Sequence, residues 1–162
     1  MFSITTADNT KVEVECIACA IAKKEVEVIG GTIAETRHFN VSNDFEYPIP
    51  GFLIIGSNRH VRSVADFDAE ESVEFVTFLA NIRKAMRTIG IEKVTMVQEE
   101  RTEDSHFHLW LFPWYEWMEE IGKGVSSIRK IMEFAGANNK TEPVFERIRS
   151  DCEKLRAILA AR

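Results

Sequence analysis

The eight residues from Ser105 to Phe112, Ser-His-Phe-His-Leu-Trp-Leu-Phe, restrict the possible fold more than any other part of the chain. The run is apolar and aromatic and contains no Gly or Pro before Pro113, which is typical of a buried strand. Successive side chains of a strand point to opposite faces. One face would carry two histidines and a tryptophan, namely His106, His108 and Trp110. The other would carry apolar side chains that join a core, namely Phe107, Leu109 and Leu111.

The two imidazoles on one face are the first indication of chemistry. Strand geometry separates them by about 7 Å, and imidazole acts as a metal ligand, a base or a nucleophile near neutral pH. A plainer interpretation is that each histidine only hydrogen-bonds a neighbour at a sheet edge. For a same-face pair inside a hydrophobic strand, we favour the functional interpretation.

The chain has 162 residues, of which 45% are hydrophobic and 28% charged, and its formal net charge is −6. This composition is ordinary for one globular domain with a substantial core. The acidic balance argues against nucleic acid or an anionic membrane as a standing partner, and no apolar run approaches the ~18 residues of a membrane span. Three cysteines and no recognisable signal peptide are expected for a cytoplasmic protein in a reducing compartment.

Most of the first half of the chain predicts strands. Gly30-Gly31 separates two β-leaning runs, Glu25–Ile29 and Thr32–Val41, and favours a hairpin turn. Two further short strands are expected, over 51–55 and 94–98. Together with the histidine-bearing strand, the order β-β-β-α-β-β followed by helices indicates an α+β fold with a meandering antiparallel sheet.

One amphipathic helix is predicted between these strands. Asp68 is a suitable N-cap, and Glu71 three residues later completes a capping box. Gly90 follows the last apolar position and is a suitable C-terminal stop. The apolar residues between them recur at intervals of three or four and form one stripe that should face the core: Phe75, Leu79, Ile82, Met86 and Ile89.

Two more helices are expected after Pro113, over about 126–135 and from about Thr141 onward. Pro143 is tolerated in the first turn of the second helix. The apolar stripe of that helix includes Cys152, which we interpret as a small buried side chain.

Cys16 and Cys19 form a Cys-x-x-Cys motif near the start of the chain. A redox pair would be expected to open a helix in a βαβ pattern, whereas the surrounding pattern is hairpin-like. Half of a zinc site is the other functional interpretation, and it needs two more ligands. His60 and His106 are the best placed of the four histidines to supply them. The alternative is a pair of structural cysteines with unrelated histidines.

A family resemblance brings these motifs together. Cys-Ile-Ala-Cys19, Pro50-Gly-Phe-Leu-Ile-Ile-Gly-Ser-Asn-Arg-His60, an amphipathic helix and the histidine-bearing strand follow one another in order. In this the chain resembles the histidine triad (HIT) family of nucleotide hydrolases and transferases, and within it bacterial proteins of the diadenosine-tetraphosphate-hydrolase-like kind. The resemblance covers about residues 14–115.

This resemblance implies an α+β fold with a five-stranded antiparallel sheet and one main helix, usually in a homodimer. We therefore expect a HIT-like domain over 1–115. The remaining residues, 116–162, would form a C-terminal helical extension packed on the same domain.

The resemblance also implies roles for individual residues. The zinc ligands of the family's zinc-binding branch fall on four residues of this chain: Cys16, Cys19, His60 and His106. The family's nucleophile falls on His108. A neutral imidazole there would attack the α-phosphorus of a nucleotide and form a nucleotidyl-histidine, which water then cleaves. This chemistry needs one ring nitrogen free and the other held by a carbonyl group.

The sequence departs from the family at the other nucleotide contacts. The third signature histidine, a phosphate contact in the family, is here Trp110, which cannot accept a hydrogen bond and would wall the pocket, stack on a base or fill the core. A Gly-Gln-Ser stretch of the family is replaced by Arg-Thr-Glu-Asp-Ser, in which Arg101 and Ser105 are the candidate donors. Gln98 stands near a phosphate-side Asn of the family, and Asp44 is the candidate for a ribose hydroxyl.

Four acidic residues near this stretch would repel a polyphosphate: Glu99, Glu100, Glu103 and Asp104. We expect them to face solvent, and the alternative is that they help to hold a Mg²⁺ ion carried by the substrate. The remaining histidine, His38, has no predicted role.

The sequence therefore predicts a zinc-containing nucleotide hydrolase or nucleotidyl transferase. It would cleave a phosphoanhydride or phosphoramidate bond, as in a dinucleoside polyphosphate, through His108. A non-catalytic nucleotide-binding or regulatory module is the first alternative, with Trp110 marking lost chemistry. A purely structural zinc protein is the second.

Overall fold

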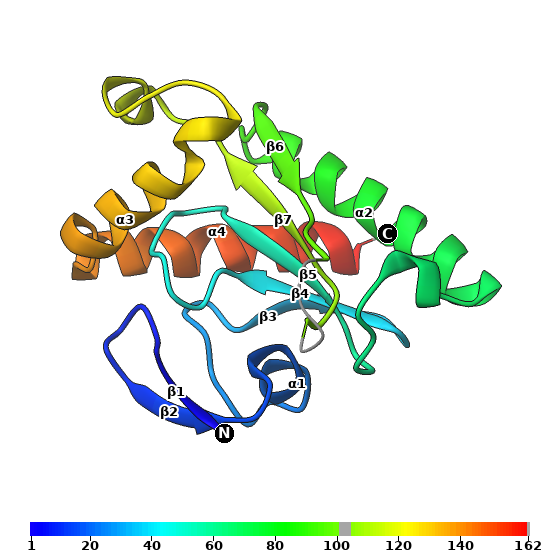
Figure 1. Cartoon of the computed structure of the whole chain (residues 1–162). Helices are drawn as coiled ribbons and strands as arrows, with labels where there is room; N and C mark the ends of the chain where they lie inside the picture. The colour runs from blue at the N-terminus through cyan, green and yellow to red at the C-terminus, as the bar shows by residue number, and fades with distance from the viewer. Residues whose placement is uncertain (101–104, 162) are drawn as a thin grey trace.

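The computed structural model describes residues 1–100 and 105–161 (Figure 1). The strands of the described residues are β1 (Phe2–Thr5), β2 (Lys11–Val14), β3 (Thr32–Glu35), β4 (Phe39–Asn43), β5 (Leu53–Ser57), β6 (Val94–Val97) and β7 (His108–Pro113). The α-helices are α1 (Ile17–Ala22), α2 (Ala69–Thr88), α3 (Ile128–Asn138) and α4 (Glu142–Ala160). Three short 3₁₀ helices complete this set: η1 (Val64–Asp66), η2 (Glu116–Glu120) and η3 (Val125–Ser127).

The predicted α+β class and five-stranded antiparallel sheet are confirmed. The strand order is β3-β4-β5-β7-β6, with every pair antiparallel, and β1 and β2 form a separate hairpin. The chain leaves the sheet after β5, passes through α2, enters at the edge as β6 and returns inward as β7. The central strand is therefore β5, and β7 lies beside it.

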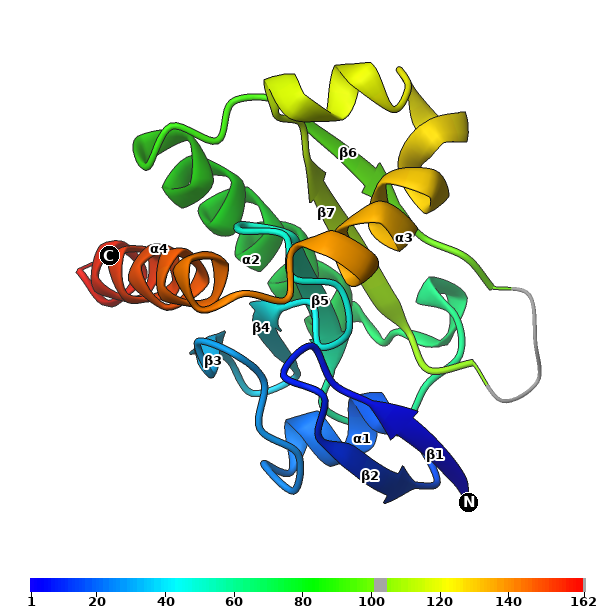
Figure 2. The same ribbon diagram turned by 90° about the vertical axis from the view of Figure 1, so that its left-hand side faces the viewer.

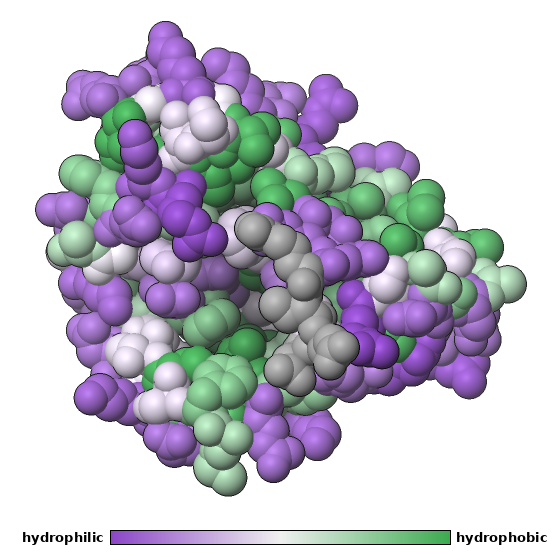
Figure 3. All heavy atoms as spheres, viewed as in Figure 1, coloured by the Kyte–Doolittle hydropathy of each residue, from purple (hydrophilic) through white to green (hydrophobic). Residues whose placement is uncertain are grey.

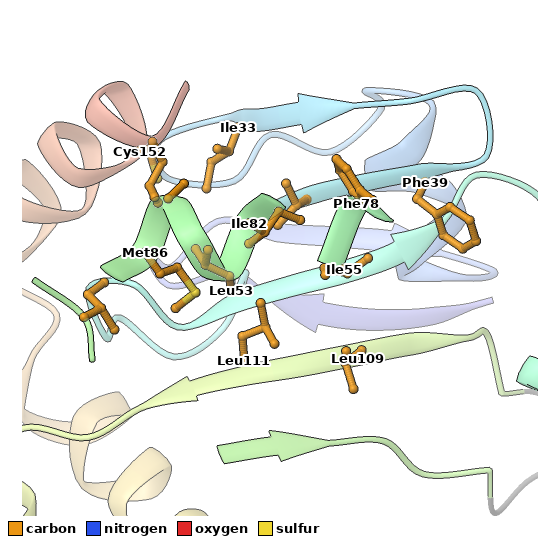
Figure 4. Packing of buried hydrophobic residues seen from close by; sticks show 14 of the residues in the cluster. Ile33, Phe39, Leu53, Ile55, Phe78, Ile82, Met86, Leu109, Leu111 and Cys152 are labelled. Atoms are coloured by element: carbon orange, nitrogen blue, oxygen red, sulfur yellow. The ribbon is translucent and has the colours of Figure 1, made fainter. Parts of the chain in front are cut away.

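Helices cover both faces of the sheet, as Figure 2 shows, with α2 and α4 on one side and α1 and α3 on the other. The alternation predicted for β7 separates two cores. Leu109 and Leu111 join the cluster that α2 and α4 close (Figure 4). Trp110 and Phe112 pack in a second cluster with α3.

The main helix follows the sequence prediction closely. The Asp68 carboxylate accepts the backbone N–H of Glu71 at 2.8 Å, and the Glu71 side chain accepts the N–H of Asp68 at 2.9 Å. All five residues of the predicted stripe lie in the α2–α4 core or pack against it. The predicted C-terminal helices are present as α3 and α4, and Cys152 is buried in the same core.

The prediction of a hairpin around Gly30-Gly31 is wrong. Residues 25–29 form no strand, and the first hairpin of the sheet turns between β3 and β4 instead. Gly30 does have a positive φ of 84°, but it serves a close approach to α4. A Cβ atom on Gly30 would lie 2.5 Å from the Sγ of Cys152, so the glycine allows the loop to contact the helix.

The histidine-bearing strand is shorter than predicted at its start. It begins at His108, and Ser105, His106 and Phe107 precede it. The N–H of Phe107 donates to the carbonyl of Val61 at 2.7 Å, and the carbonyl of Phe107 accepts the N–H of Ser57 at 3.4 Å. This segment therefore bonds both to the end of β5 and to the loop that follows it. The Phe107 ring packs in an edge-to-face arrangement against the rings of Phe67 and Phe75.

No helix within the described residues combines the length and apolar composition needed to cross a membrane.

Candidate metal centre and adjoining pocket

Four side chains from separate parts of the chain meet beside α1. Cys16 is the N-cap of α1 and Cys19 lies in its first turn, while His60 follows β5 and His106 precedes β7. Their ligand atoms all lie within 4.8 Å of one another. The Nδ1 of His106 is 3.4 Å from each cysteine Sγ, and the Nδ1 of His60 is 3.4 Å from the Sγ of Cys19.

These distances suit a tetrahedral zinc ion. Zinc–sulfur and zinc–nitrogen bonds of about 2.3 and 2.0 Å place neighbouring ligand atoms roughly 3.5 Å apart. The other ring nitrogen of His106, Nε2, donates to the carbonyl oxygen of Ser57 at 2.8 Å. This bond selects the tautomer in which the Nδ1 lone pair faces the two sulfur atoms, as is usual for a metal-bound histidine.

The pKa shifts of residues in the cluster also favour metal binding. Burial lowers the pKa of His106, which keeps the ring neutral as a ligand must be. Burial and the adjacent Cys16 thiol raise the pKa of Cys19 to about 11, so this sulfur atom would ionise near neutral pH only beside a cation.

His108 differs from its neighbour in its bonding. It is half-buried, and its Nδ1 lies 2.8 Å from the carbonyl oxygen of His106. Because a carbonyl only accepts, Nδ1 carries a proton, and in the neutral ring Nε2 then keeps its lone pair. This is the arrangement that the nucleophile role requires, with one nitrogen oriented by a carbonyl and the other free.

His108 lines a pocket of about 220 Å³ on the face of the sheet between α1 and α3. Figure 3 shows the molecule hollowed on this side. The walls come from α1, β4 and the loop after it, β5, β7 and α3. Apolar side chains supply most of the wall, among them Ile17, Ile21, Phe45, Ile54 and Trp110.

Asp44 is the charged group held deepest in this wall. Its carboxylate accepts the backbone N–H groups of Glu46 and Tyr47 at 2.9 and 2.7 Å. Burial outweighs these bonds and raises the pKa of Asp44 to about 7. The predicted ribose contact thus lies in the same pocket as His108.

The structure brings together some predicted nucleotide contacts and leaves others apart. Trp110 and Asp44 line the pocket, whereas Gln98 and Ser105 are not among the described residues that do so. Gln98 donates instead to the Glu100 carboxylate at 3.0 Å. Arg101 lies outside the described residues.

The acidic residues near positions 99–104 were predicted to face solvent, and the structure agrees for the two that it describes. Glu99 and Glu100 are exposed, and Glu103 and Asp104 lie outside the described residues. His38, which had no predicted role, contacts Glu74 of α2 through Nδ1 at 2.9 Å. It therefore ties the β3–β4 hairpin to the main helix.

Sequence reasoning missed the contribution of α3 to the pocket. Met132 of this helix lines the pocket and is only 3% exposed. One turn later, Gly136 lies against the ring of Tyr47, since a Cβ there would be 3.4 Å from Cδ1 of the tyrosine. Because these contacts join segments that are far apart in the chain, no local pattern could have predicted them.

No family model matches this sequence, and no curated protein matches it. Solved structures do match. A Zn-bound histidine triad family protein from Mycobacterium smegmatis has a TM-score of 0.61 and 17% identity, over 90% of this chain and 94% of that chain. A hypothetical histidine triad nucleotide-binding protein from Sulfolobus tokodaii strain 7 has a TM-score of 0.59 and 17% identity, over 86% of this chain and 93% of that chain.

A HIT family hydrolase from Clostridium thermocellum also matches, with a TM-score of 0.52 and 15% identity, over 70% of this chain and 99% of that chain. At these identities the likeness concerns the fold. This chain has the fold of the histidine triad proteins.

Proposed function

We propose that this protein is a zinc-containing nucleotide hydrolase or nucleotidyl transferase that works through His108. The observation that carries the proposal is the bond from His108 Nδ1 to the carbonyl of His106, at 2.8 Å, at the wall of a pocket. A neutral imidazole held in this way presents Nε2 as a nucleophile. The histidine triad names of the matching structures support the same class of reaction.

The reaction would proceed in two displacements at one phosphorus atom. Nε2 of His108 attacks the α-phosphorus of a nucleotide, a P–N bond forms, and the bond to the leaving phosphate, amine or second nucleotide breaks. Water then attacks the same phosphorus, the P–N bond breaks, and a nucleoside monophosphate leaves. The bond to His106 holds the ring in line through both steps.

Zinc would be held by the four clustered ligands, Cys16, Cys19, His60 and His106. With all four positions of a tetrahedral ion supplied by protein, its chemistry is that of a cross-link rather than a Lewis acid. It would connect α1 to the segments that follow β5 and precede β7. His106 is fixed at the point where β7 begins, so the cross-link also fixes the carbonyl that orients His108.

The rest of the pocket suits a nucleoside. The Asp44 carboxyl group would accept a ribose hydroxyl, and the apolar side chains of α1 and Phe45 would lie against a base. We further propose that the C-terminal helices belong to this site, since Met132 of α3 lines it. Dinucleoside polyphosphates and nucleoside phosphoramidates are the two substrate classes to be tested, and Mg²⁺ would enter only with a polyphosphate.

The experiment compares His108→Ala with wild type on a panel of dinucleoside polyphosphates and nucleoside phosphoramidates. We expect His108→Ala to lower release of nucleoside monophosphate by at least about 10³-fold, with bound metal and melting temperature unchanged. His38→Ala is the matched control, because His38 contacts α2 and is not among the described residues that line the pocket. Equal turnover in His108→Ala and wild type would refute the mechanism.

A binding module without catalysis is the second candidate, and Trp110 favours it because an indole stands where the family has its third histidine, which would mark lost chemistry. Under that alternative, the wild-type protein would show a thermal shift with a nucleotide and no turnover on the same panel. The homodimer implied by the resemblance remains a prediction, which light scattering during size-exclusion chromatography can check.

A further inference from the structure

Asn40 lies directly across the central strand from His108. In the register of the sheet, Asn40 of β4 pairs with Gly56 of β5, and Gly56 pairs with His108 of β7. Residues in one cross-strand row point to the same face of a sheet. All three residues line the pocket. Gly56, which has no side chain, forms the pocket floor between the Asn40 amide and the His108 imidazole.

The orientation of the Asn40 amide follows from its neighbour. Asn58 donates from Nδ2 to the carbonyl oxygens of Thr36 and Arg37, at 3.1 Å each, so its Oδ1 must be the acceptor that faces Asn40. Nδ2 of Asn40 donates to that oxygen at 2.9 Å. The amide is buried, with 8% of the residue exposed, and it is held in one orientation.

One N–H of the Asn40 amide makes only a long hydrogen bond within the protein. Besides Asn58, Nδ2 of Asn40 lies 3.5 Å from the carbonyl oxygen of Gly56, which is longer than a strong hydrogen bond. A Cβ atom added at Gly56 would lie 3.9 Å from Nδ2 and 4.0 Å from Oδ1 of Asn40. The polar end of the amide therefore faces the space above the glycine.

The same pocket lacks cationic side chains among the residues that the structure describes. Its described lining contains Asp44, Glu46 and His108 but no Lys or Arg. Trp110 stands two residues further along the same face, paired with Ile54, and its indole offers one neutral N–H donor and no cation. A phosphoryl group attacked by His108 would thus need a neutral donor to stabilise the charge on its oxygen atoms.

We infer that Asn40 is a catalytic residue whose amide N–H binds a non-bridging oxygen of the phosphoryl group attacked by His108. This inference rests on the proposed function and deepens it. Two strand spacings of about 4.8 Å separate the backbones of β4 and β7, and side chains reaching over Gly56 leave space for one phosphoryl group. Asn40 keeps its protons throughout, and it supplies the donor that the missing third histidine would otherwise supply.

The test replaces one non-bridging oxygen of the attacked phosphorus by sulfur, which accepts hydrogen bonds weakly. The substrate is a dinucleoside polyphosphate or a nucleoside phosphoramidate, whichever the wild-type protein cleaves faster, made as separate Rp and Sp α-thio isomers. We expect wild type to cleave one isomer faster. Asn40→Ala should lower kcat on the oxygen substrate by about 10²–10³-fold, change KM little, and bring the two isomers to similar rates.

Asn58→Ala separates catalysis from a structural role, because it removes the bond that holds the Asn40 amide and keeps the amide itself. We expect it to slow both isomers less than Asn40→Ala does and to preserve their order. If Asn40→Ala slows both isomers equally, or slows them no more than Asn58→Ala, Asn40 acts through structure and the inference is overturned.

Gly56→Ala provides a second variant in case Asn40→Ala folds poorly. Its methyl group would enter the space proposed for the phosphoryl group, without touching the Asn40–Asn58 bond. A fall in kcat of at least 10-fold at unchanged melting temperature supports the inference, and unchanged kcat overturns it. Wild type without turnover on any substrate would instead refute the proposed function, which is a different result.

Discussion

The metal cluster and the pocket meet at the start of β7, and each uses one histidine of the same short segment. His106 has both ring nitrogens engaged, one by the Ser57 carbonyl and the other by the cysteine thiols. His108 has one nitrogen held by a carbonyl, and no hydrogen bond is found for the other among residues 1–100 and 105–161. The comparison teaches that position relative to neighbouring backbone, rather than residue type, separates the proposed metal ligand from the proposed nucleophile.

The two regions also shift the pKa of a buried carboxyl group in opposite directions. Near the cluster, the Arg59 guanidinium holds the pKa of Glu71 down at about 2. In the pocket, burial without a cationic partner raises the pKa of Asp44 to about 7. The ion pair with Arg59 therefore stabilises the folded first region. In the second region, ionising the buried carboxyl group costs free energy of folding, but its charge is available to a ligand.

Metal removal should have the largest effect, and it should be confined to the cluster region. Chelation, or His106→Ala, is expected to lower bound zinc from about one equivalent to none and the melting temperature by roughly 10 °C, equivalent to a few kcal/mol. Hydrogen exchange should accelerate over α1 and the β1–β2 hairpin. The α2–α4 core should remain protected, and equal loss of protection in both regions would contradict the separation.

Asp44→Asn should change how stability varies between pH 5 and 8. Because the folded pKa lies above the unfolded value of 3.8, the contribution of Asp44 to wild-type stability is greatest below pH 3.8 and is lost as pH rises toward and through 7. The asparagine keeps an oxygen for both backbone N–H groups and removes the titration. We expect the variant to lose about 2–3 kcal/mol less than wild type across this range. Parallel urea-unfolding curves at each pH would contradict this.

Glu71→Gln should have the opposite pH signature. The folded pKa of Glu71 lies below its ordinary value of 4.5, so its contribution is present above pH 4.5 and disappears as pH falls toward 2. The variant should be less stable than wild type by about 1–3 kcal/mol at pH 7, with the difference shrinking in acid. Thermal melts from pH 7 down to 3 measure it, and a constant difference would exclude the carboxylate as its source.

Met132→Ala should have the smallest effect on the site and should leave the metal cluster unchanged, although it also leaves a gap in the core cluster to which Met132 belongs. The shorter side chain removes apolar contact with a bound nucleotide and no hydrogen bond, so we expect KM for the nucleotide to rise a few-fold. Bound zinc should not change. Phe134→Ala is a suitable control on the same helix, because Phe134 is 43% exposed and is not among the described residues that line the pocket.

The sequence by itself determined the parts of this protein that depend on local periodicity or on residue type. Alternation along β7 and the capped α2 helix belong here. The family resemblance, and not a local pattern, implied the set of two cysteines and two histidines that the structure brings together. A cap or an apolar stripe is complete within a few turns of chain, so local residues suffice to predict it. Where a glycine served a distant contact, as Gly30 does with Cys152, the same local reasoning predicted a hairpin that does not exist.

Only the tertiary structure decided which distant residues share the pocket. Asn40 lies across β5 from His108 because β7, and not β6, pairs with the second edge of β5. Met132 comes from a helix that was assigned from the sequence to a C-terminal extension. Strand register and helix docking depend on the summed packing of many separated side chains. No single stretch of sequence encodes that sum, and so the neighbours of His108 could be identified only from the assembled sheet.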